Sequence, residues 1–218
     1  MSPQPTVDEL FIADAPGAWR AAGFDVEGDL CVVGTVRLRL QDQHGGRGIV
    51  AWSLRNAATH DLDGLQTSAS TTPPPAPPDA PHSNGVVSID HLVVLTPDLD
   101  RTTKALRNGG FDLRREREGP TPGGSRRQSF FRMGELILEV VEAPEGTRIA
   151  QDSNGPARLW GISFLVEELE HTAASLGDLL GEPRAAVQPG RRIATLRSEA
   201  GLGPAIAFMT PGPGAITV

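Results

Sequence analysis

The chain has 218 residues, of which 39 % are hydrophobic and 22 % charged, an ordinary composition for one large or two small globular domains. Its 20 basic and 27 acidic residues give a net charge of −7, which argues against binding a nucleic-acid backbone as the main task. The sequence has no run of 18 apolar residues, no basic and apolar leader, and a single cysteine, Cys31, so we expect a cytoplasmic protein without a membrane span or an internal disulfide.

The first 60 residues read as a degenerate module of one strand, one short helix and further strands. "DELFIAD" predicts the first strand, and "TVRLRLQD" and "IVAWSLRNA" predict two more. Ala18–Val26 matches Ala105–Leu113 at Ala, Arg, Gly, Phe and Asp, which relates this region to a later part of the chain. We expect Trp19 and Trp52 to anchor its core.

The next segment is rich in proline, serine and threonine. Gly64–Val87 has few bulky apolar residues, and its proline run favours an extended polyproline II conformation. We interpret it as a surface linker; a ligand for a proline-binding domain is the alternative. His44, His60 and His82 lie in turn or linker sequence, without the spacing of metal ligands.

Two later stretches of the chain resemble each other. Ser88–Leu106 and Trp160–Leu176 each contain an apolar run, an acidic helix start and an amphipathic helical pattern. The carboxylates suit the first helical turn because the helix dipole is positive there. In this alignment Gly161 stands where the first stretch has His91.

The similarity continues through two arginine doublets. Gly124–Gly134 aligns with Pro189–Gly201, which places Arg126-Arg127 over Arg191-Arg192. A last apolar strand and a proline turn follow in each copy. Each copy therefore reads as strand, helix and three strands, which predicts an α+β fold of tandem βαβββ modules. The expected divisions of the chain are a degenerate module, a linker and two further modules, at residues 1–60, 61–87, 88–144 and 145–218.

A tandem βαβββ repeat opened by "IDHLVVLTPDLD" and closed by "ELILEVVEAP" resembles the vicinal oxygen chelate superfamily. That superfamily includes glyoxalase I, extradiol dioxygenases and bleomycin resistance proteins. The resemblance covers residues 86–213, with a weaker echo in 5–58. It implies an open, cup-shaped barrel of mixed β-sheet with the helices outside, and a divalent metal (Zn, Fe, Mn or Ni) on the concave face.

The resemblance also implies where the metal ligands stand, early in the first strand and in the middle of the last strand of each module. These positions hold His91 and Glu139 in one module, and Gly161 and Ala207 in the other. Imidazole and carboxylate groups are good metal ligands, whereas glycine and alanine supply none. A catalytic metal normally takes three protein ligands, so we expect a degenerate site without a tightly bound metal or other cofactor.

Three interpretations of His91 and Glu139 stay open. They are polar residues that line a pocket and bond to each other, or two weak ligands of a metal completed by Glu9, Gln188 or His171. In the third, His91 is a structural histidine.

Arginines supply almost all the basic residues, with Lys104 the single lysine, a bias typical of bacterial chains from GC-rich genomes. Strand alternation sends one arginine of each doublet inward, where it would bind a carboxylate or phosphate, but the pattern does not decide which one. The candidate substrate-binding residues are Arg127, Arg192, Gln128, Phe130 and Trp160, the last as an aromatic wall beside Gly161.

The sequence supports two main functions. One is a glyoxalase-like lyase or isomerase that acts on a small oxygenated metabolite, with Glu139 as general base and His91 orienting the substrate. The other is a metal-independent drug or metabolite binding protein of the bleomycin-resistance type, for which the acidic balance suits a cationic ligand. A non-catalytic interaction module is the third. We expect a small-molecule ligand, no nucleic-acid or membrane partner, and a sheet edge of the degenerate module that could pair in a homodimer.

Overall fold

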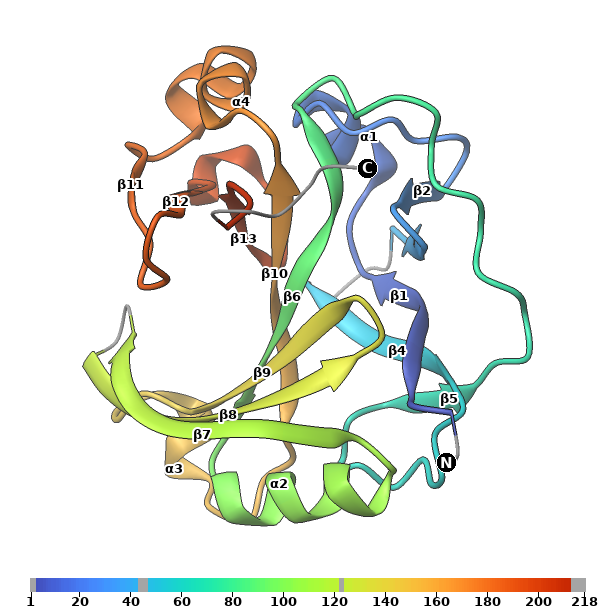
Figure 1. Ribbon diagram of the computed structural model, residues 1–218, viewed down its shortest axis with the longest axis vertical. Coiled ribbons are helices and arrows are strands. Elements are labelled where there is room, and N and C mark those ends of the chain that lie inside the picture. Colours follow the sequence, from blue (N-terminus) through green and yellow to red (C-terminus); the bar gives the residue numbers. More distant parts are fainter. Residues whose placement is uncertain (1–2, 43–46, 122–123, 213–218) are drawn as a thin grey trace. The chain divides into compact units, whose positions relative to one another are not determined.

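The structure is a computed structural model and describes residues 3–42, 47–121 and 124–212; His44 lies outside them. Within these ranges the strands belong to a five-stranded and an eight-stranded sheet (Figure 1). No helix in the described ranges is long and apolar enough to cross a membrane. The elements, in chain order, are β1 (Thr6–Ile12), α1 (Pro16–Ala21), β2 (Leu30–Val33), β3 (Val36–Leu40), β4 (Ile49–Arg55), β5 (Thr67–Ala69), β6 (Val86–Thr96), α2 (Leu99–Asn108), β7 (Asp112–Thr121), β8 (Gly124–Met133), β9 (Leu136–Glu142), α3 (Arg148–Gln151), β10 (Arg158–Val166), α4 (Leu169–Leu176), η1 (Gly177–Leu179), β11 (Arg184–Ala185), β12 (Arg192–Thr195), η2 (Ser198–Ala200) and β13 (Ala205–Met209).

The predicted tandem βαβββ modules are confirmed. The first consists of β6, α2, β7, β8 and β9, and the second of β10, α4, β11, β12 and β13. The glycine turns before the last strands also correspond, because Gly134 and Gly201 have φ angles of 63° and 75°. Only glycine adopts such angles without steric cost, so the turn position is marked in the sequence.

The chain divides into two compact units, each built from several segments. The first unit contains the residues up to Glu9, Ala51–Pro73 and His91–Trp160. The second contains Leu10–Val50, Pro74–Asp90 and the residues from Gly161 on. Each of the two βαβββ modules therefore lies largely in one unit, together with parts of the N-terminal region.

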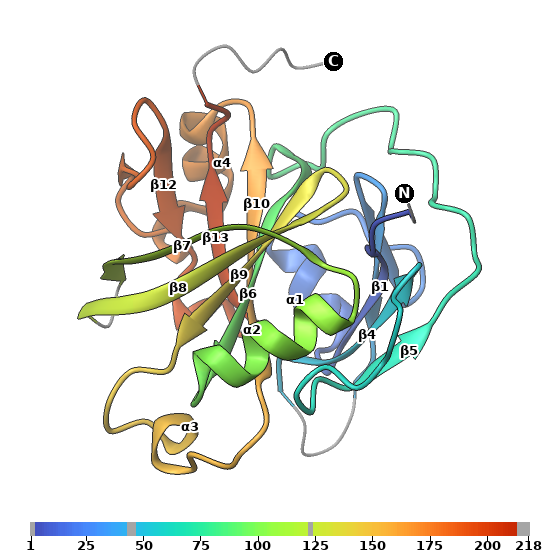
Figure 2. The same cartoon turned by 60° about the horizontal axis from the view of Figure 1, so that its bottom comes forward.

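In the first unit the strand order is β6-β9-β8-β7, with β6 parallel to β9 and the other pairs antiparallel. Helix α2 packs against β8 and β9 on one face, as Figures 1 and 2 show. The part of this helix face that α2 covers is mostly apolar and buried, which supplies about 1.5–3 kcal/mol for each large side chain removed from water. Its buried side chains include Leu92, Val94, Phe131, Leu138 and Val140.

In the second unit the order is β10-β13-β12-β11, and α4 packs against β12 and β13. Two of its strands are short: β11 has 2 residues and β12 has 4, whereas β7 and β8 have 10 each. The segment around β11 contains Pro183 and Pro189, and proline cannot donate to a strand ladder. The repeat is therefore less regular in structure than in sequence.

Residues 6–55 contain β1, α1 and then β2, β3 and β4, in the order strand, helix and three strands. β2 and β3 pair antiparallel in the second unit, where Trp19 packs against Phe24 and Phe164. β4 pairs parallel with β5 in the first unit, where Trp52 stacks on Phe111. Both tryptophans are fully buried, in agreement with their expected role as core residues.

The segment expected to be a surface linker is partly built into the units. Thr67–Ala69 forms β5, and His82 and Asn84 are buried. The Asn84 side chain donates to the Ala22 carbonyl at 2.8 Å and accepts from the Val86 amide at 3.1 Å. Residues 71–81, between these anchors, are mostly exposed and contain the proline run.

Candidate functional site

His91 and Glu139 lie together on the face of the first unit's sheet that is opposite α2, which we call the site face. The parallel register of β6 and β9 pairs Val93 with Glu139, so His91, two residues earlier, points to the same side as the carboxylate. His91 Nε2 lies 3.6 Å from Glu139 Oε2, and their side chains are 15 % and 17 % exposed. A carboxylate and an imidazole that are both accessible to solvent can exchange protons with a bound molecule.

Gln128 holds the other oxygen of Glu139. Its amide nitrogen donates to Glu139 Oε1 at 2.9 Å, and its carbonyl oxygen accepts from Arg117 Nε at 2.7 Å. The guanidinium group can only donate, so the orientation of the buried amide is fixed. Four side chains are thereby linked across four strands, from Arg117 through Gln128 and Glu139 to His91.

Phe130 lies beside this chain of contacts, opposite Glu139 in the β8–β9 register. The Cζ atoms of Arg115 and Arg117 stand 5.4 Å and 5.1 Å from its ring centroid, within the range of cation–π attraction. The sequence pattern indicated Gln128 and Phe130 as candidate site residues but not the two arginines. The available signal was the alternation of charges in "RRERE", which places arginines at every second position of β7.

The second arginine of each doublet does not join this group. Arg127 lies on the helix face and pairs with Asp100 of α2 at 2.6 Å, and its hydrogen bond and charge hold the pKa of that carboxyl below its ordinary value. Arg192 pairs with Glu170 of α4, and its hydrogen bond lowers the pKa of Glu170. Both arginines therefore fasten a strand to the first turn of the module's own helix, at positions that correspond in the repeat.

The first arginine of each doublet has the opposite orientation. Alternation places Arg126 on the site face, in line with Gln128. Arg191, its counterpart in the second unit, bonds to Asp90 at 2.5 Å and to the Thr210 carbonyl at 2.8 Å. The sequence left open which arginine of each doublet turns away from the helix. In both modules it is the first one.

The second module has no side chains equivalent to His91 and Glu139. Gly161 pairs with Ala205 as His91 pairs with Ile137, so the aligned positions correspond in register. A Cβ atom at Gly161 would come within 2.7 Å of the Ala205 carbonyl oxygen, closer than real Cβ contacts. Between Gly161 and Leu165, Ser163 is 2 % exposed and its hydroxyl has no hydrogen-bond partner in the described part of the chain.

Trp160 is 44 % exposed at the end of the first unit. Adjacent residues of a strand point to opposite faces, so its ring and the Gly161 position lie on different sides of β10. The structure therefore does not place Trp160 as a wall beside Gly161.

The residues present do not fit the metal that the resemblance implies. Across the described ranges, no three His, Cys, Asp or Glu side chains are grouped so that they could hold a metal ion. Glu9 thus does not complete a site with His91 and Glu139. His171 bonds instead to the Ser83 carbonyl at 3.1 Å, and Gln188 is exposed before β12. A two-ligand site lacks the third protein ligand that catalytic metals normally have.

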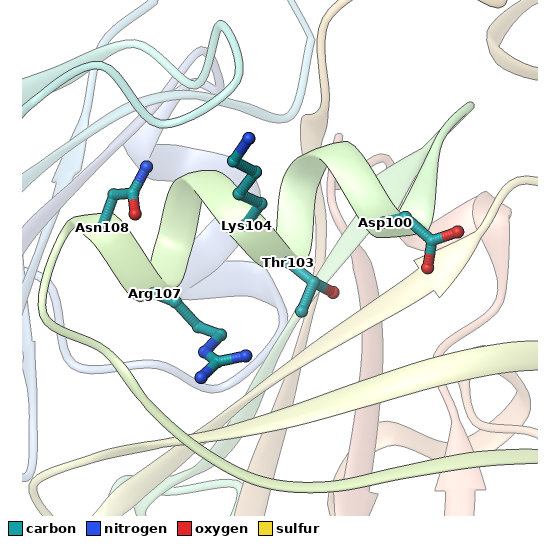
Figure 3. A pocket seen from close by; sticks show the side chains of 5 residues that line it. All are labelled: Asp100, Thr103, Lys104, Arg107 and Asn108. Atoms are coloured by element: carbon teal, nitrogen blue, oxygen red, sulfur yellow. The ribbon is translucent and has the colours of Figure 1, made fainter.

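Two hollows lie elsewhere within single units. One, of about 460 Å³, follows α2, with Thr103 and Arg107 on one side of the helix and Lys104 and Asn108 on the other (Figure 3). The other, of about 670 Å³, lies beside His82 and Asp25 in the second unit. Neither is lined by His91 or Glu139. We place the candidate site by its chemistry, because the site face joins an accessible base to fixed hydrogen-bond donors.

No family model matches the sequence, and no curated protein matches it significantly. Solved structures are similar to it at low identity. A methylmalonyl-CoA epimerase from Mycobacterium tuberculosis is 17 % identical with a TM-score of 0.51, over 62 % of this chain and 95 % of the epimerase.

Two further structures match over nearly the whole chain. A 4-hydroxymandelate synthase mutant from Streptomyces coelicolor is 14 % identical with a TM-score of 0.65, over 98 % of this chain and 95 % of the synthase. A fusion protein of a xylose isomerase-like TIM barrel and a 4-hydroxyphenylpyruvate dioxygenase is 14 % identical with a TM-score of 0.62, over 100 % of this chain and 50 % of the fusion. At these identities the likeness establishes the architecture and not the activity. The chain therefore has the glyoxalase-like fold that it shares with these structures.

Proposed function

We propose that the protein binds a small oxygenated metabolite on the site face and transfers a proton to or from it, as a lyase or isomerase. The observation that carries the proposal is the placement of Glu139. One oxygen of its carboxylate accepts from Gln128 at 2.9 Å, and the other lies 3.6 Å from His91 on a partly accessible face. A carboxylate held in this way is suited to act as a general base.

The roles of the neighbours follow from these contacts. Gln128, fixed by Arg117, orients the Glu139 carboxylate, while His91 is placed to bond to a carbonyl or hydroxyl oxygen of the substrate. No step of this proposal passes through a metal, because the side chains present do not supply three ligands for one within the described ranges.

Ligand binding without turnover is the alternative, in a metal-independent drug or metabolite binding protein. The single pair of His91 and Glu139, with Gly161 and Ala207 at the corresponding positions of the other module, favours it, because half of the superfamily's functional positions carry no polar group. The two possibilities differ in one measurable respect, which is whether a proton leaves a carbon atom of the ligand.

Proton exchange into deuterated water tests the proposal. The protein would be incubated with small 2-oxo acids, 2-hydroxy acids and methylmalonyl-CoA, the last because the epimerase of similar fold acts on it. Loss of the C–H signal would be followed by ¹H NMR. Glu139→Gln should slow exchange by about 100-fold or more, the usual contribution of a general base.

Exposed Glu135, in the turn before β9, offers a matched control. Glu135→Gln should exchange at the wild-type rate, and both variants should melt near the wild-type temperature. Saturable binding without exchange in the wild type would reject turnover and leave the binding alternative. A Glu139→Gln variant with undiminished exchange would remove Glu139 from the reaction.

A further inference from the structure

We propose that Arg115 and Arg117 form an oxyanion subsite on the site face, so that the ligand carries a carboxylate or phosphate group. This inference deepens the proposed function and rests on it for the position of the reacting end of the ligand. It rests on four observations: the missing counter-ions, the shared aromatic ring, the register of β7 and the distance to Glu139.

Neither arginine forms an ion pair with any residue in the described part of the chain. Arg117 donates to the neutral amide of Gln128, and Arg115 contacts the Phe130 ring. Arg101, Arg114 and Arg127 differ, since all three pair with carboxylates of the same unit. Two unpaired cations on one face of a chain with net charge −7 mark a local reversal of charge.

Phe130 holds both guanidinium groups near one place. Their Cζ atoms are 5.4 Å and 5.1 Å from the same ring centroid, although like charges repel. The negative face of the ring attracts each cation, and a bound oxyanion would neutralise both. Guanidinium groups bind such oxyanions bidentately, with two parallel hydrogen bonds.

A register shift in β7 places the arginines on this face. Leu113 pairs with Phe131 and Arg115 with Phe130, so Arg114 is an extra residue, as in a β-bulge. Beyond it, Arg115 and Arg117 point to the site face, whereas Glu116 and Glu118 point to the helix face. There Glu116 accepts from the Ser129 hydroxyl at 3.1 Å. The bulge thus separates positive from negative side chains, a device often found beside functional sites.

The geometry also sets the length of the ligand. β7 and β9 are separated by β8, and neighbouring strands lie about 4.8 Å apart, so the backbones that carry the arginines and Glu139 are about 10 Å apart across the sheet, while the side chain of Gln128 alone bridges Arg117 and Glu139. A ligand that reaches both has an oxyanion at one end, its reacting carbon at the other and Phe130 beneath its middle. The local charge therefore argues for an anionic ligand, against the cationic ligand that the net charge of the whole chain favours.

Isothermal titration with three probes tests the subsite. The probes are 4-phenylbutyrate, 2-phenylethyl phosphate and neutral 4-phenylbutanamide. The wild type should bind the two anions at least about tenfold more tightly than the amide, because hydrogen bonds between two charged groups are stronger than those to a neutral group. The relative affinities of carboxylate and phosphate identify which oxyanion the subsite prefers.

Arg115→Gln should weaken anion binding by about tenfold or more, and Arg115→Lys, which keeps the charge, should recover part of it. Arg114→Gln is the matched control, because Arg114 is an exposed neighbour already paired with Asp112 at 3.0 Å. Thermal melts of each variant show that the fold is retained.

Equal affinity for the amide and the anions, no binding of any probe, or an equal loss in the Arg114→Gln control would overturn the subsite. These outcomes differ from a failure of the proposed function. Glu139→Gln removes the base and not the subsite, so it should still bind 4-phenylbutyrate. Anion binding without proton exchange would therefore reject turnover and support the subsite.

Discussion

Gly161 leaves no room for a side chain at the position that corresponds to His91 in the other module. We predict that Gly161→His does not create a metal site and lowers the free energy of unfolding by about 1–3 kcal/mol, because its Cβ would meet the Ala205 carbonyl oxygen at 2.7 Å. Urea denaturation and titration with zinc chloride measure the two effects. Gly17→Ala is the control, since a Cβ there meets no atom within 4 Å and alanine favours the helix α1. A Gly161→His variant of normal stability that binds zinc would contradict the prediction.

His82 makes the stability of the folded protein depend on pH. The Asp25 amide donates to its Nδ1 at 3.0 Å, so Nε2 carries the hydrogen and donates to the Val32 carbonyl at 3.1 Å. Burial lowers the pKa of His82, against the opposing effect of the Asp25 charge. The neutral ring is therefore the form that fits the folded protein.

The direction of the pH effect follows from proton counting. Below the ordinary histidine pKa of about 6.5 the unfolded chain binds a proton that the folded His82 does not, so unfolding is favoured as pH falls. We predict that the free energy of unfolding decreases below about pH 6.5 until the lowered pKa is passed. Urea denaturation at a series of pH values between 5 and 8 gives the free energy of unfolding at each pH. For His82→Gln this free energy should fall less steeply with decreasing pH than for the wild type. Exposed His60→Gln is the control, and an equal change of slope there would refute the assignment.

Asp63 holds the start of helix α2 in place through two hydrogen bonds. One carboxylate oxygen accepts from Arg101 Nε at 2.6 Å and the other from the Thr102 hydroxyl at 2.5 Å, and the Asp63 side chain is only 9 % exposed. The hydrogen bond to Asp63 raises the pKa of Arg101 above its ordinary value. The helix that covers the core of the first unit is thus tied to the segment after β4.

We predict that Asp63→Asn lowers the free energy of unfolding by about 1–3 kcal/mol, because an amide cannot accept both bonds as a carboxylate does. Asparagine tolerates the φ of 55° at this position, so the backbone is not the cause. Urea denaturation of this variant would be compared with Asp61→Asn, an exposed neighbour that should stay within about 0.5 kcal/mol of wild type. Equal effects in the two variants would contradict the role of Asp63.

The strands and helices could be predicted from the sequence where a repeated pattern marks them. The modules follow from two copies of the same apolar runs and acidic helix starts, and Asp98 caps α2 by accepting from the Arg101 amide at 2.9 Å, as an acidic helix start predicts. The meeting of His91 with Glu139 followed from the resemblance. Arg115 and Arg117 escaped prediction because regular alternation from Leu113 would point them to the helix face, and the extra residue Arg114 reverses it. A bulge leaves no mark in hydrophobic periodicity.

The N-terminal region of the chain is divided between the two compact units. It contributes Trp52 and β5 to the first and Trp19, β2 and β3 to the second, which a division of the sequence into successive domains does not anticipate. The two tryptophans are fully buried against Phe111 and Phe164 of the βαβββ modules. The reason is physical: each module leaves aromatic side chains that segments distant in sequence must cover.

We predict that a fragment of residues 86–218, which holds both modules, does not fold by itself. Without residues 1–85 it lacks Trp19 and Trp52, and losing a buried tryptophan costs about 3–5 kcal/mol, comparable with the stability of a whole domain. The fragment should lack near-ultraviolet circular dichroism and a cooperative melt, with the full chain measured in parallel. A cooperative transition in the fragment would show that the N-terminal region is dispensable.

The segmented arrangement of the units has a consequence for a chain that has been cut. The backbone passes from one unit to the other five times, and one passage, between Pro73 and Pro74, lies in the exposed run of residues 71–81. A protease that cleaves there breaks one covalent connection and leaves four others intact. The nicked protein would therefore run as two bands on a denaturing gel and, under native conditions, still elute as one particle.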